Sequence, residues 1–393
     1  MTAAAPAAAE RQVSLLADPA FQARAESGLA ELYAMRFAAA DAEFAAIAGR
    51  HPDHPVGPFL GALTTWWRIL RDPADTSHDA RLLAAMEEAL ARADRRLERD
   101  RHDVDGKFFR GAALAFRGRL RSMRGEWLPA AYDCKRALKL VREVVEDDPR
   151  NADLYFGIGL YDYFGEVLPE RYPLLRPATL FLPAADRQRG IARLTRVARD
   201  GRYVQTEAAW FLLQIQFFFE RDYRESLRWS GWLRRTHPGN SLFHEMHGRV
   251  LLAAGRTAEA RREFETVLER LAAGSPAYTV AQAERAHYSL AVAAMRRGDH
   301  RQALRHLESL DALTARRDDD VPLRVLGRLR RGMCFDALGK RSTAVALYRQ
   351  VLAMDDSAGA HDRAKELLQR PYRPGTRDDQ DDETAVEGTR VAR

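Results

Sequence analysis

The sequence predicts an all-α chain of stacked antiparallel helix pairs, an α-solenoid. The helix-forming residues Ala, Leu, Arg and Glu occur throughout, and runs of β-branched residues are scarce. Two consecutive units of 34 residues, 207–240 and 241–274, each have the pattern of a helix, a turn and a second helix. Because one such pair cannot bury its own apolar face, units of this kind have to stack on their neighbours.

Small residues at defined places allow the two helices of a unit to approach closely. In the second unit Gly248 and Ala260 are the small residues. Leu251, Phe264 and Val267 then fill the space between this helix pair and the next. The spacing therefore predicts both the pairing of helices and their stacking.

The order of these landmarks resembles the tetratricopeptide repeat (TPR) superfamily, in a bacterial-type form. Its 34-residue pattern is Trp-x2-Leu-Gly-x2-Tyr, then Ala-x3-Phe, then Pro. In the first unit Trp210, Leu213 and Phe217 take the Trp, Leu and Tyr places, and Pro238 closes the second helix. Gln214 stands where Gly is usual. The resemblance implies a right-handed superhelix with a concave inner groove.

Similar landmarks recur along most of the chain. We expect about eight helix pairs between residues 19 and 370, with a last helix at about 358–369 capping the stack. The Ala-rich terminus 1–18 and the acid-rich tail 371–393 have no periodicity, so both are predicted to be disordered.

An apolar insertion is predicted at 165–186, between the two helices of one repeat. Pro169, Pro173, Pro177 and Pro183 forbid a continuous helix there. The helical pattern resumes at about Arg187. Insertions in repeat arrays emerge on one face, which is often the binding face.

A second resemblance covers this central segment. The residues 157–163, Leu168-Pro169 and 186–194 are similar to the central segment of a eukaryotic TPR-like family associated with inclusion-body clearance and the mitochondrial outer membrane. The similarity supports an array that contains an apolar insertion.

The chain has a net charge of +6 and a pI of about 9.4, and almost all of its basic residues are arginine. Only five basic residues are lysine, and the arginines are interleaved with acids along the helices. That pattern is typical of solvated helix faces, so no nucleic-acid partner is expected. Cys134 and Cys334 lie in different repeats, so we expect two buried thiols and no disulfide.

No catalytic, cofactor or metal site is predicted. The chain has no nucleophile elbow and no phosphate-binding loop. His244 and His247 are one helical turn apart, but the TPR register directs both into helix packing and suggests no third ligand. We therefore expect a protein that is not an enzyme and holds no cofactor.

The chain has no basic and apolar leader and no run of 18 apolar residues. A cytoplasmic location without a membrane span is expected, although an export signal upstream of this sequence would change that expectation. The sequence does not indicate an oligomeric state.

The TPR resemblance implies which residues line the inner groove. Several are aromatic, and a groove of this kind exposes more apolar surface than a soluble monomer normally shows. Arg249, Arg285 and Arg296 are expected to pair with acidic groups of a partner. The predicted groove residues are Phe156, Leu160, Tyr163, Phe164, Phe211, Ile215, Phe218, Phe219, Arg249 and Arg285.

The sequence leaves two possibilities for what covers this groove. The apolar insertion packs back into the groove as a permanent plug, or the groove takes an apolar segment of another protein. The second possibility predicts a non-catalytic scaffold or adaptor that binds a peptide or protein. The alternative is a membrane-assembly or regulatory accessory protein that contacts lipid or a small apolar ligand through residues 165–186.

Overall fold

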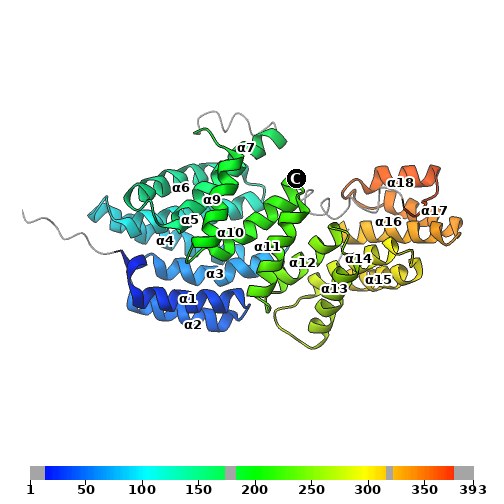
Figure 1. Cartoon of the computed structure of the whole chain (residues 1–393), viewed down its shortest axis with the longest axis horizontal. Coiled ribbons are helices and arrows are strands. Elements are labelled where there is room, and N and C mark those ends of the chain that lie inside the picture. Colours follow the sequence, from blue (N-terminus) through cyan, green and yellow to red (C-terminus); the bar gives the residue numbers. More distant parts are fainter. Residues whose placement is uncertain (1–13, 173–182, 316–321, 376–393) are drawn as a thin grey trace, which may run out of the picture. The chain divides into compact units, whose positions relative to one another are not determined.

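A computed structural model describes residues 14–172, 183–315 and 322–375, and the elements in these ranges are all helical (Figure 1). The contacts divide the chain into two compact units. The first unit comprises Met1–Leu32 and Arg36–Gln205, and the second comprises Tyr33–Met35 and Thr206–Arg393.

In the first unit each α-helix packs against its neighbour along the chain. α3 also contacts α5, which is the first helix of the following pair. The elements are η1 (Leu15–Ala17), α1 (Pro19–Tyr33), α2 (Phe37–Arg50), α3 (Val56–Arg71), α4 (Asp79–Arg99), α5 (Val104–Met123), α6 (Trp127–Asp147), η2 (Ala152–Leu154), α7 (Tyr155–Arg171) and α9 (Arg187–Asp200).

In the second unit the first helices of successive pairs contact one another: α12 with α14, α14 with α16, and α16 with α18. These contacts are what stacking of the pairs requires. The elements are α10 (Gln205–Gln214), the π-helical turn η4 (Ile215–Glu220), α11 (Tyr223–Thr236), α12 (Ser241–Ala253), α13 (Thr257–Ala272), α14 (Val280–Arg296), α15 (His300–Thr314), α16 (Pro322–Ala337), α17 (Arg341–Leu352) and α18 (Ala360–Gln369).

In three of the helix pairs, a glycine on the first helix packs against an aromatic ring on the second. A Cβ built on each of these glycines would lie 2.4 to 2.9 Å from a ring atom, so only glycine allows the observed approach. The contacts are Gly28 with Phe44, Gly248 with Phe264, and Gly332 with Tyr348. The prediction of a helical-repeat solenoid is confirmed, and the described helices form eight consecutive pairs followed by α18.

The described helical structure begins and ends beyond the predicted boundaries. Residues 14–18, which the sequence assigned to a disordered terminus, include η1, and Ser14 Oγ and Leu15 N donate to the Asp105 carboxylate at 2.5 and 2.7 Å. At the other end Tyr372 is buried, and its N–H donates to Asp336 Oδ2 at 3.0 Å. A buried carboxylate thus holds the chain at each end. The predicted disorder of 1–13 and 376–393 lies outside the described residues.

The helix that precedes the predicted insertion is longer than expected. α7 continues from Tyr155 through Pro169 to Arg171, so the proline pattern does not end the helix at residue 165. Near the end of a helix, Pro169 removes one backbone hydrogen bond, and the next turn still closes because Tyr172 N donates to Leu168 O at 2.8 Å. Residues 173–182, and with them the question of a plug, lie outside the described residues.

Both cysteines are free thiols. Cys334 is buried in α16 as expected, whereas Cys134 in α6 is exposed, which corrects the prediction of a second buried thiol. Its sulfur still faces α5, because a Cβ built on Gly118 would lie 3.2 Å from it. Cys134 therefore stands where a ring stands in the other glycine-containing pairs.

Candidate functional site

A π-helical turn interrupts the first helix of the second unit. α10 ends at Gln214 and η4 follows over Ile215–Glu220. Asp222 N then donates to Gln216 O at 2.9 Å, after Arg221 in the left-handed region at φ 55°. π-helical turns are rare and are frequently found at functional sites. This turn carries three consecutive phenylalanines.

The three phenylalanines have different environments. Phe217 is fully buried, whereas Phe218 and Phe219 are half-buried. Phe211, on the preceding α10, is half-buried as well. We call Phe211, Phe218 and Phe219 the phenylalanine surface. Ile215 is fully buried, so this predicted groove residue does not contribute to it.

Arg249 on α12 lies beside the π-helical turn. Its guanidinium carbon is 5.5 Å from the centroid of the Phe218 ring and 5.8 Å from that of Phe217. A guanidinium at this range is attracted by the ring quadrupole. The side chain is only 7% exposed, so the cation is held against the rings and is not a freely moving surface charge.

Arg285 on α14 is engaged by an acid of the same unit. Its Nε and Nη2 donate to the two carboxylate oxygens of Glu245 on α12 at 2.6 and 2.9 Å. Because this pairing is bidentate, the Arg285 charge is balanced within the protein. Arg296 donates to the backbone oxygen of Leu252. These contacts within the unit weaken the expectation that Arg285 and Arg296 pair with acids of a partner.

The predicted groove residues of the first unit lie on α7. Phe156, Leu160 and Phe164 are half-buried, but Tyr163 is fully buried. A Cβ built on Gly190 of α9 would lie 2.6 Å from the backbone nitrogen of Tyr163, so Tyr163 is part of the close packing of α7 against α9. The remaining three residues stay candidates for a surface of the first unit.

Buried carboxylates tie helices together, and sequence reasoning did not identify them. Asp162 on α7 is buried and accepts hydrogen bonds from Arg189 at 3.0 and 3.1 Å and a further one from Arg193. The only sequence signal was the spacing of two arginines by one turn on the following helix, which is common in this chain.

His244 belongs to a polar network in the second unit. Its Nδ1 lies 2.8 Å from the Tyr278 hydroxyl, and its Nε2 lies 2.8 Å from Glu263 Oε2. Burial opposes ionisation of Glu263, but contacts with His244 and Arg234 outweigh it and lower its pKa to about 2. Among the described residues, no three His, Cys, Asp or Glu side chains are grouped to hold a metal ion.

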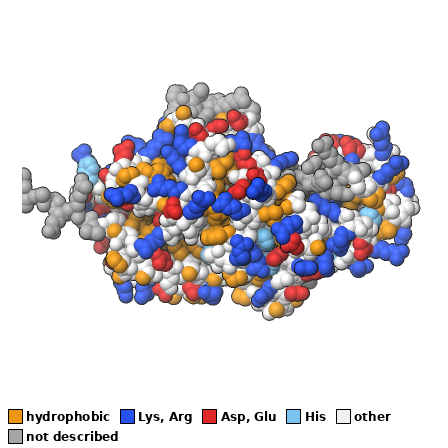
Figure 2. Space-filling view, viewed as in Figure 1, with side chains coloured by type: hydrophobic (Ala, Val, Ile, Leu, Met, Phe, Trp, Pro, Cys, Tyr) orange, Lys and Arg blue, Asp and Glu red, His pale blue; other side chains and the backbone are white. Residues whose placement is uncertain are grey.

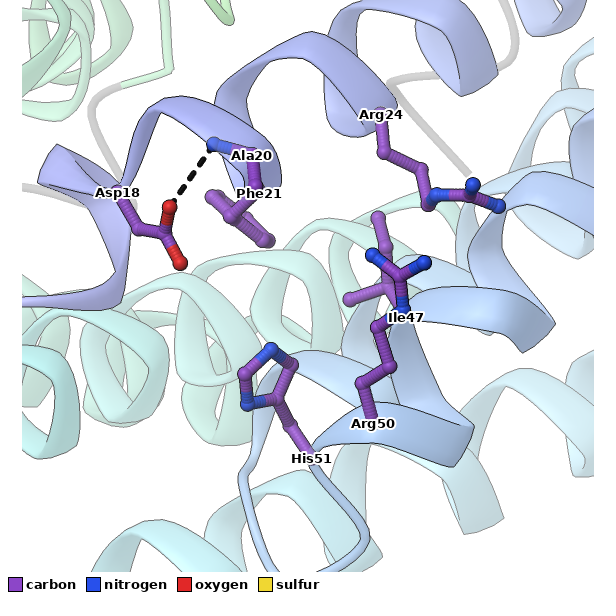
Figure 3. A pocket seen from close by; sticks show the side chains of 7 residues that line it. All are labelled: Asp18, Ala20, Phe21, Arg24, Ile47, Arg50 and His51. Atoms are coloured by element: carbon purple, nitrogen blue, oxygen red, sulfur yellow. Dashed lines mark hydrogen bonds between the residues drawn. The ribbon is translucent and has the colours of Figure 1, made fainter.

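A small pocket of about 180 Å³ opens in the first unit, between α1 and α2 (Figure 3). Phe21 and Ile47 form its apolar part, and Arg50 and His51 extend toward them from the end of α2. Ligand pockets usually have volumes of about 300 to 1,000 Å³. In addition, Arg24 on its rim pairs with Glu43 at 3.3 Å. The pocket is therefore too small for a drug-sized ligand.

A profile of the tetratricopeptide repeat matches residues 327–357, which include most of α16 and all of α17. This segment contains the Gly332–Tyr348 contact, and two other helix pairs repeat that contact with a glycine and a phenylalanine. The chain thus contains a tetratricopeptide repeat (TPR) within an array of similar helix pairs. The profile match does not reach the central segment, so the similarity of that segment to the inclusion-body-clearance family stays a prediction.

No curated protein matches this chain. Solved structures that are similar to it include yeast Tom70 (11% identity, TM-score 0.41, 80% of this chain and 63% of that chain). The P58(IPK) TPR domain covers 95% of this chain and 99% of its own at 15% identity and a TM-score of 0.24. The structure of Naa15/Naa10 bound to HypK covers 95% of this chain and 72% of its own chain. The identity is 12% and the TM-score is 0.31.

These TM-scores are low, so the fold assignment rests on the repeat match and on the helix pairs themselves. This chain spans 63% of the Tom70 chain, which is less than two thirds of its length. Among the described residues, none of the helices has the length and apolar character that a membrane crossing needs.

Proposed function

We propose that this TPR protein is a non-catalytic scaffold that binds a peptide or protein segment through the phenylalanine surface of its second unit. The observation that carries the proposal is the position of Arg249, with its guanidinium 5.5 Å from the ring of the half-buried Phe218. Aromatic and arginine side chains are the residues that most often anchor a bound partner.

The local geometry supports binding of an extended or helical segment with apolar side chains. Phe211 and Phe218 are seven residues apart, about two helical turns, so two apolar side chains of a ligand have anchors. Arg249, which is only 7% exposed, holds the Phe218 ring in place beside this surface. Phe156, Leu160 and Phe164 on α7 are proposed as a separate contact surface of the first unit.

The membrane-accessory alternative is not favoured, and no described contact supports it. Its proposed element was the 165–186 insertion, of which residues 165–171 belong to α7. TPR proteins generally act as interaction modules, and the polar networks around His244 and Asp162 are accounted for by helix packing.

Affinity capture tests the proposal when it is performed with matched variants. The variant Phe211→Ala/Phe218→Ala is expected to lose proteins that the wild type captures and to keep its helical circular dichroism. Phe335→Ala, at a half-buried phenylalanine of α16, serves as the control and should retain them. If the double variant loses only thermal stability and keeps every captured protein, these residues serve the fold and the proposal is wrong.

A further inference from the structure

The first helices of the stacked pairs in the second unit carry a surplus of arginine. α12, α14 and α16 contact one another and therefore share one side of this unit. Their sequences contain seven arginines but only three acids, Glu245, Glu284 and Asp336. Because the rest of these helices is mainly apolar, the arginines decide the charge of this side.

Three of the seven arginines contact the second helix α15. Arg324 donates to the backbone oxygen of Thr314. Arg328 and Arg331 are paired with Asp311. The other four arginines contact a neighbouring first helix or the π-helical turn instead, so they belong to the side that the first helices share.

Contacts between the first helices place these four arginines in a row. Arg330 Nε on α16 donates to the Tyr288 hydroxyl on α14 at 2.9 Å. Arg296 on α14 donates to the backbone oxygen of Leu252 on α12. The other two are the arginines of the candidate site, one beside the π-helical turn and one paired with an acid of α12. We call this set the arginine row: Arg249, Arg285, Arg296 and Arg330.

Two acids lie along the row. Glu245 pairs with Arg285, and the pair uses two of the five guanidinium N–H groups. Glu284 is buried and precedes Tyr288 by one helical turn, so it is on the face that contacts Arg330. Four arginines against two acids give the row a net positive charge.

Two cations of the row are accessible to a ligand. Arg285 and Arg296 are half-buried, whereas Arg249 and Arg330 are buried. A carboxylate on this side contacts the first two directly. It is also attracted by the charges of the other two, which the protein screens less than water would. The ligand that complements the row is therefore a segment with several carboxylates.

The described chain ends beside the row. Tyr372 is buried, and its N–H donates at 3.0 Å to Asp336 near the end of α16. Arg330 lies six residues earlier in the same helix, about 9 Å away at 1.5 Å per residue. Residues 376–393 follow and lie outside the described residues.

This final stretch of the sequence supplies the complementary charge. Residues 378–387 include six acids and no basic residue. An extended chain from Gly375 to Glu387 spans up to about 40 Å. Packed helices have axes about 8–10 Å apart, so the segment is long enough to pass from α16 over α14 to α12. The acids are Asp378, Asp379, Asp381, Asp382, Glu383 and Glu387.

The charge of the whole unit favours the same ligand. Residues 206–315 and 322–375 contain 26 basic and 18 acidic side chains, a net charge of +8. Figure 2 shows Lys and Arg side chains spread over the helices of this unit. Such a field attracts an acidic segment in general, whereas the row specifies where the segment binds.

We infer that the acidic segment 378–387 binds along the arginine row as a tethered ligand of the second unit, with carboxylates against Arg285 and Arg296. A separate acidic partner has to displace it. The tether gives the segment an effective concentration in the range of about millimolar, which favours it over the same segment of a second copy. The inference is independent of the phenylalanine surface and stands if that proposal fails.

Electron paramagnetic resonance of the full-length protein tests this inference. A nitroxide is attached to Ala385→Cys in a Cys134→Ser background, since Cys134 is exposed and Cys334 is buried. At about 0.1 M salt the bound label should have a rotational correlation time roughly threefold longer than in Arg285→Glu/Arg296→Glu, because charge-assisted contacts hold the segment. At about 1 M salt, where the Debye length is about 3 Å, the difference should disappear.

A matched control separates the row from the general charge of the unit. Arg301→Glu/Arg305→Glu makes the same change of charge at two exposed arginines of α15 and should keep the label immobilised. Asp381→Lys/Asp382→Lys/Glu383→Lys should release the label without any change in the helices. Combining these lysines with Arg285→Glu/Arg296→Glu should immobilise it again. A purely structural effect of the arginine substitutions would not be reversed in this way.

Four results overturn the inference. The label is mobile in the otherwise wild-type protein at low salt. The label stays immobilised in Arg285→Glu/Arg296→Glu, or is released equally in Arg301→Glu/Arg305→Glu. The combined variant remains mobile. Immobilisation increases with protein concentration between about 1 and 100 μM, which assigns the row to the segment of a second copy instead.

Discussion

The ring of Phe44 occupies the space beside Gly28, because a Cβ built on Gly28 would lie 2.4 Å from Cε1 of Phe44. Gly28→Ala is therefore expected to lower the free energy of unfolding of the first unit by about 1–3 kcal/mol, since an added methyl group forces packed side chains to shift. Chemical denaturation monitored by circular dichroism measures the change.

Gly61→Ala is the matched control for this substitution. Gly61 lies in the middle of α3, and a Cβ there would meet no atom within 4 Å. Alanine should stabilise the helix by about 0.5–1 kcal/mol because glycine loses more backbone entropy on folding. Equal effects of the two substitutions would show that the Phe44 contact does not require glycine.

The Asp153 carboxylate is hydrogen-bonded to the loop that follows α9. Its Oδ1 accepts hydrogen bonds from the backbone N–H groups of Arg202, Tyr203 and Val204 at 3.0 to 3.1 Å. Asp153→Ala should cost about 2–3 kcal/mol because it leaves these donors without their acceptor. Faster hydrogen exchange at these three amides is the expected local sign. Asp200→Ala, at the exposed end of α9, should change neither the stability nor the exchange rates.

The Glu263 carboxylate contributes to the free energy of unfolding by an amount that depends on pH. Its pKa in the folded protein is about 2, against 4.5 for an unperturbed glutamate. A lowered carboxyl pKa stabilises the fold above pH 4.5, and this contribution is lost as the pH falls from 4.5 toward 2. Urea titrations over this range should show the stability difference between wild type and Glu263→Gln shrinking toward acid pH. A difference that stays constant would mean that the ionised carboxylate is not the stabilising form.

His287 and His306 should make the second unit sensitive to mild acid. Their Nδ1 atoms lie 3.2 Å apart, and burial lowers the pKa of both, that of His287 to about 4. Between pH 6.5 and about 4 the unfolded chain binds protons that the folded chain excludes, so the stability falls as the pH falls. His237 and His247 have similarly low pKa values of about 4 and contribute to the same slope.

The variant His287→Gln/His306→Gln should have a shallower loss of stability over that pH range. The midpoint of urea unfolding, measured from pH 7.5 to 4, gives the slope for each protein. His102→Gln replaces an exposed histidine and should retain the wild-type slope. An unchanged slope in the double variant would show that these two imidazoles are already protonated in the folded state.

The sequence was sufficient to predict the helical repeats because their packing depends on residue size at fixed spacing. Gly28 with Phe44 and Gly248 with Phe264 are recognisable as a small residue and a ring at the same separation. The number of residues between the glycine and the ring is the same even where other positions of the repeat differ from the pattern. The repeats can therefore be recognised although none of them has the full pattern.

The side-chain pairs of the candidate site could not be predicted in the same way. Glu245 and Arg285 lie in successive repeats, and nothing in a chain with 62 basic residues marks this pair among many others. The π-helical turn was also missed, because Ile215 to Glu220 has the same composition as an ordinary apolar helix. Its formation depends on how the chain returns toward α11, which is a property of the packed structure.

The π-helical turn also means that chain length, and not only residue identity, directs the phenylalanines. A π-helical turn contains about one residue more than an α-helical turn, so removing a single residue from 215–220 would let an uninterrupted α-helix form and would change the direction of the side chains inside the turn. Phe218 and Phe219 would then face new neighbours while the composition stayed almost the same. Insertions and deletions in these six positions thus provide a route by which a repeat array acquires a different ligand without losing its architecture.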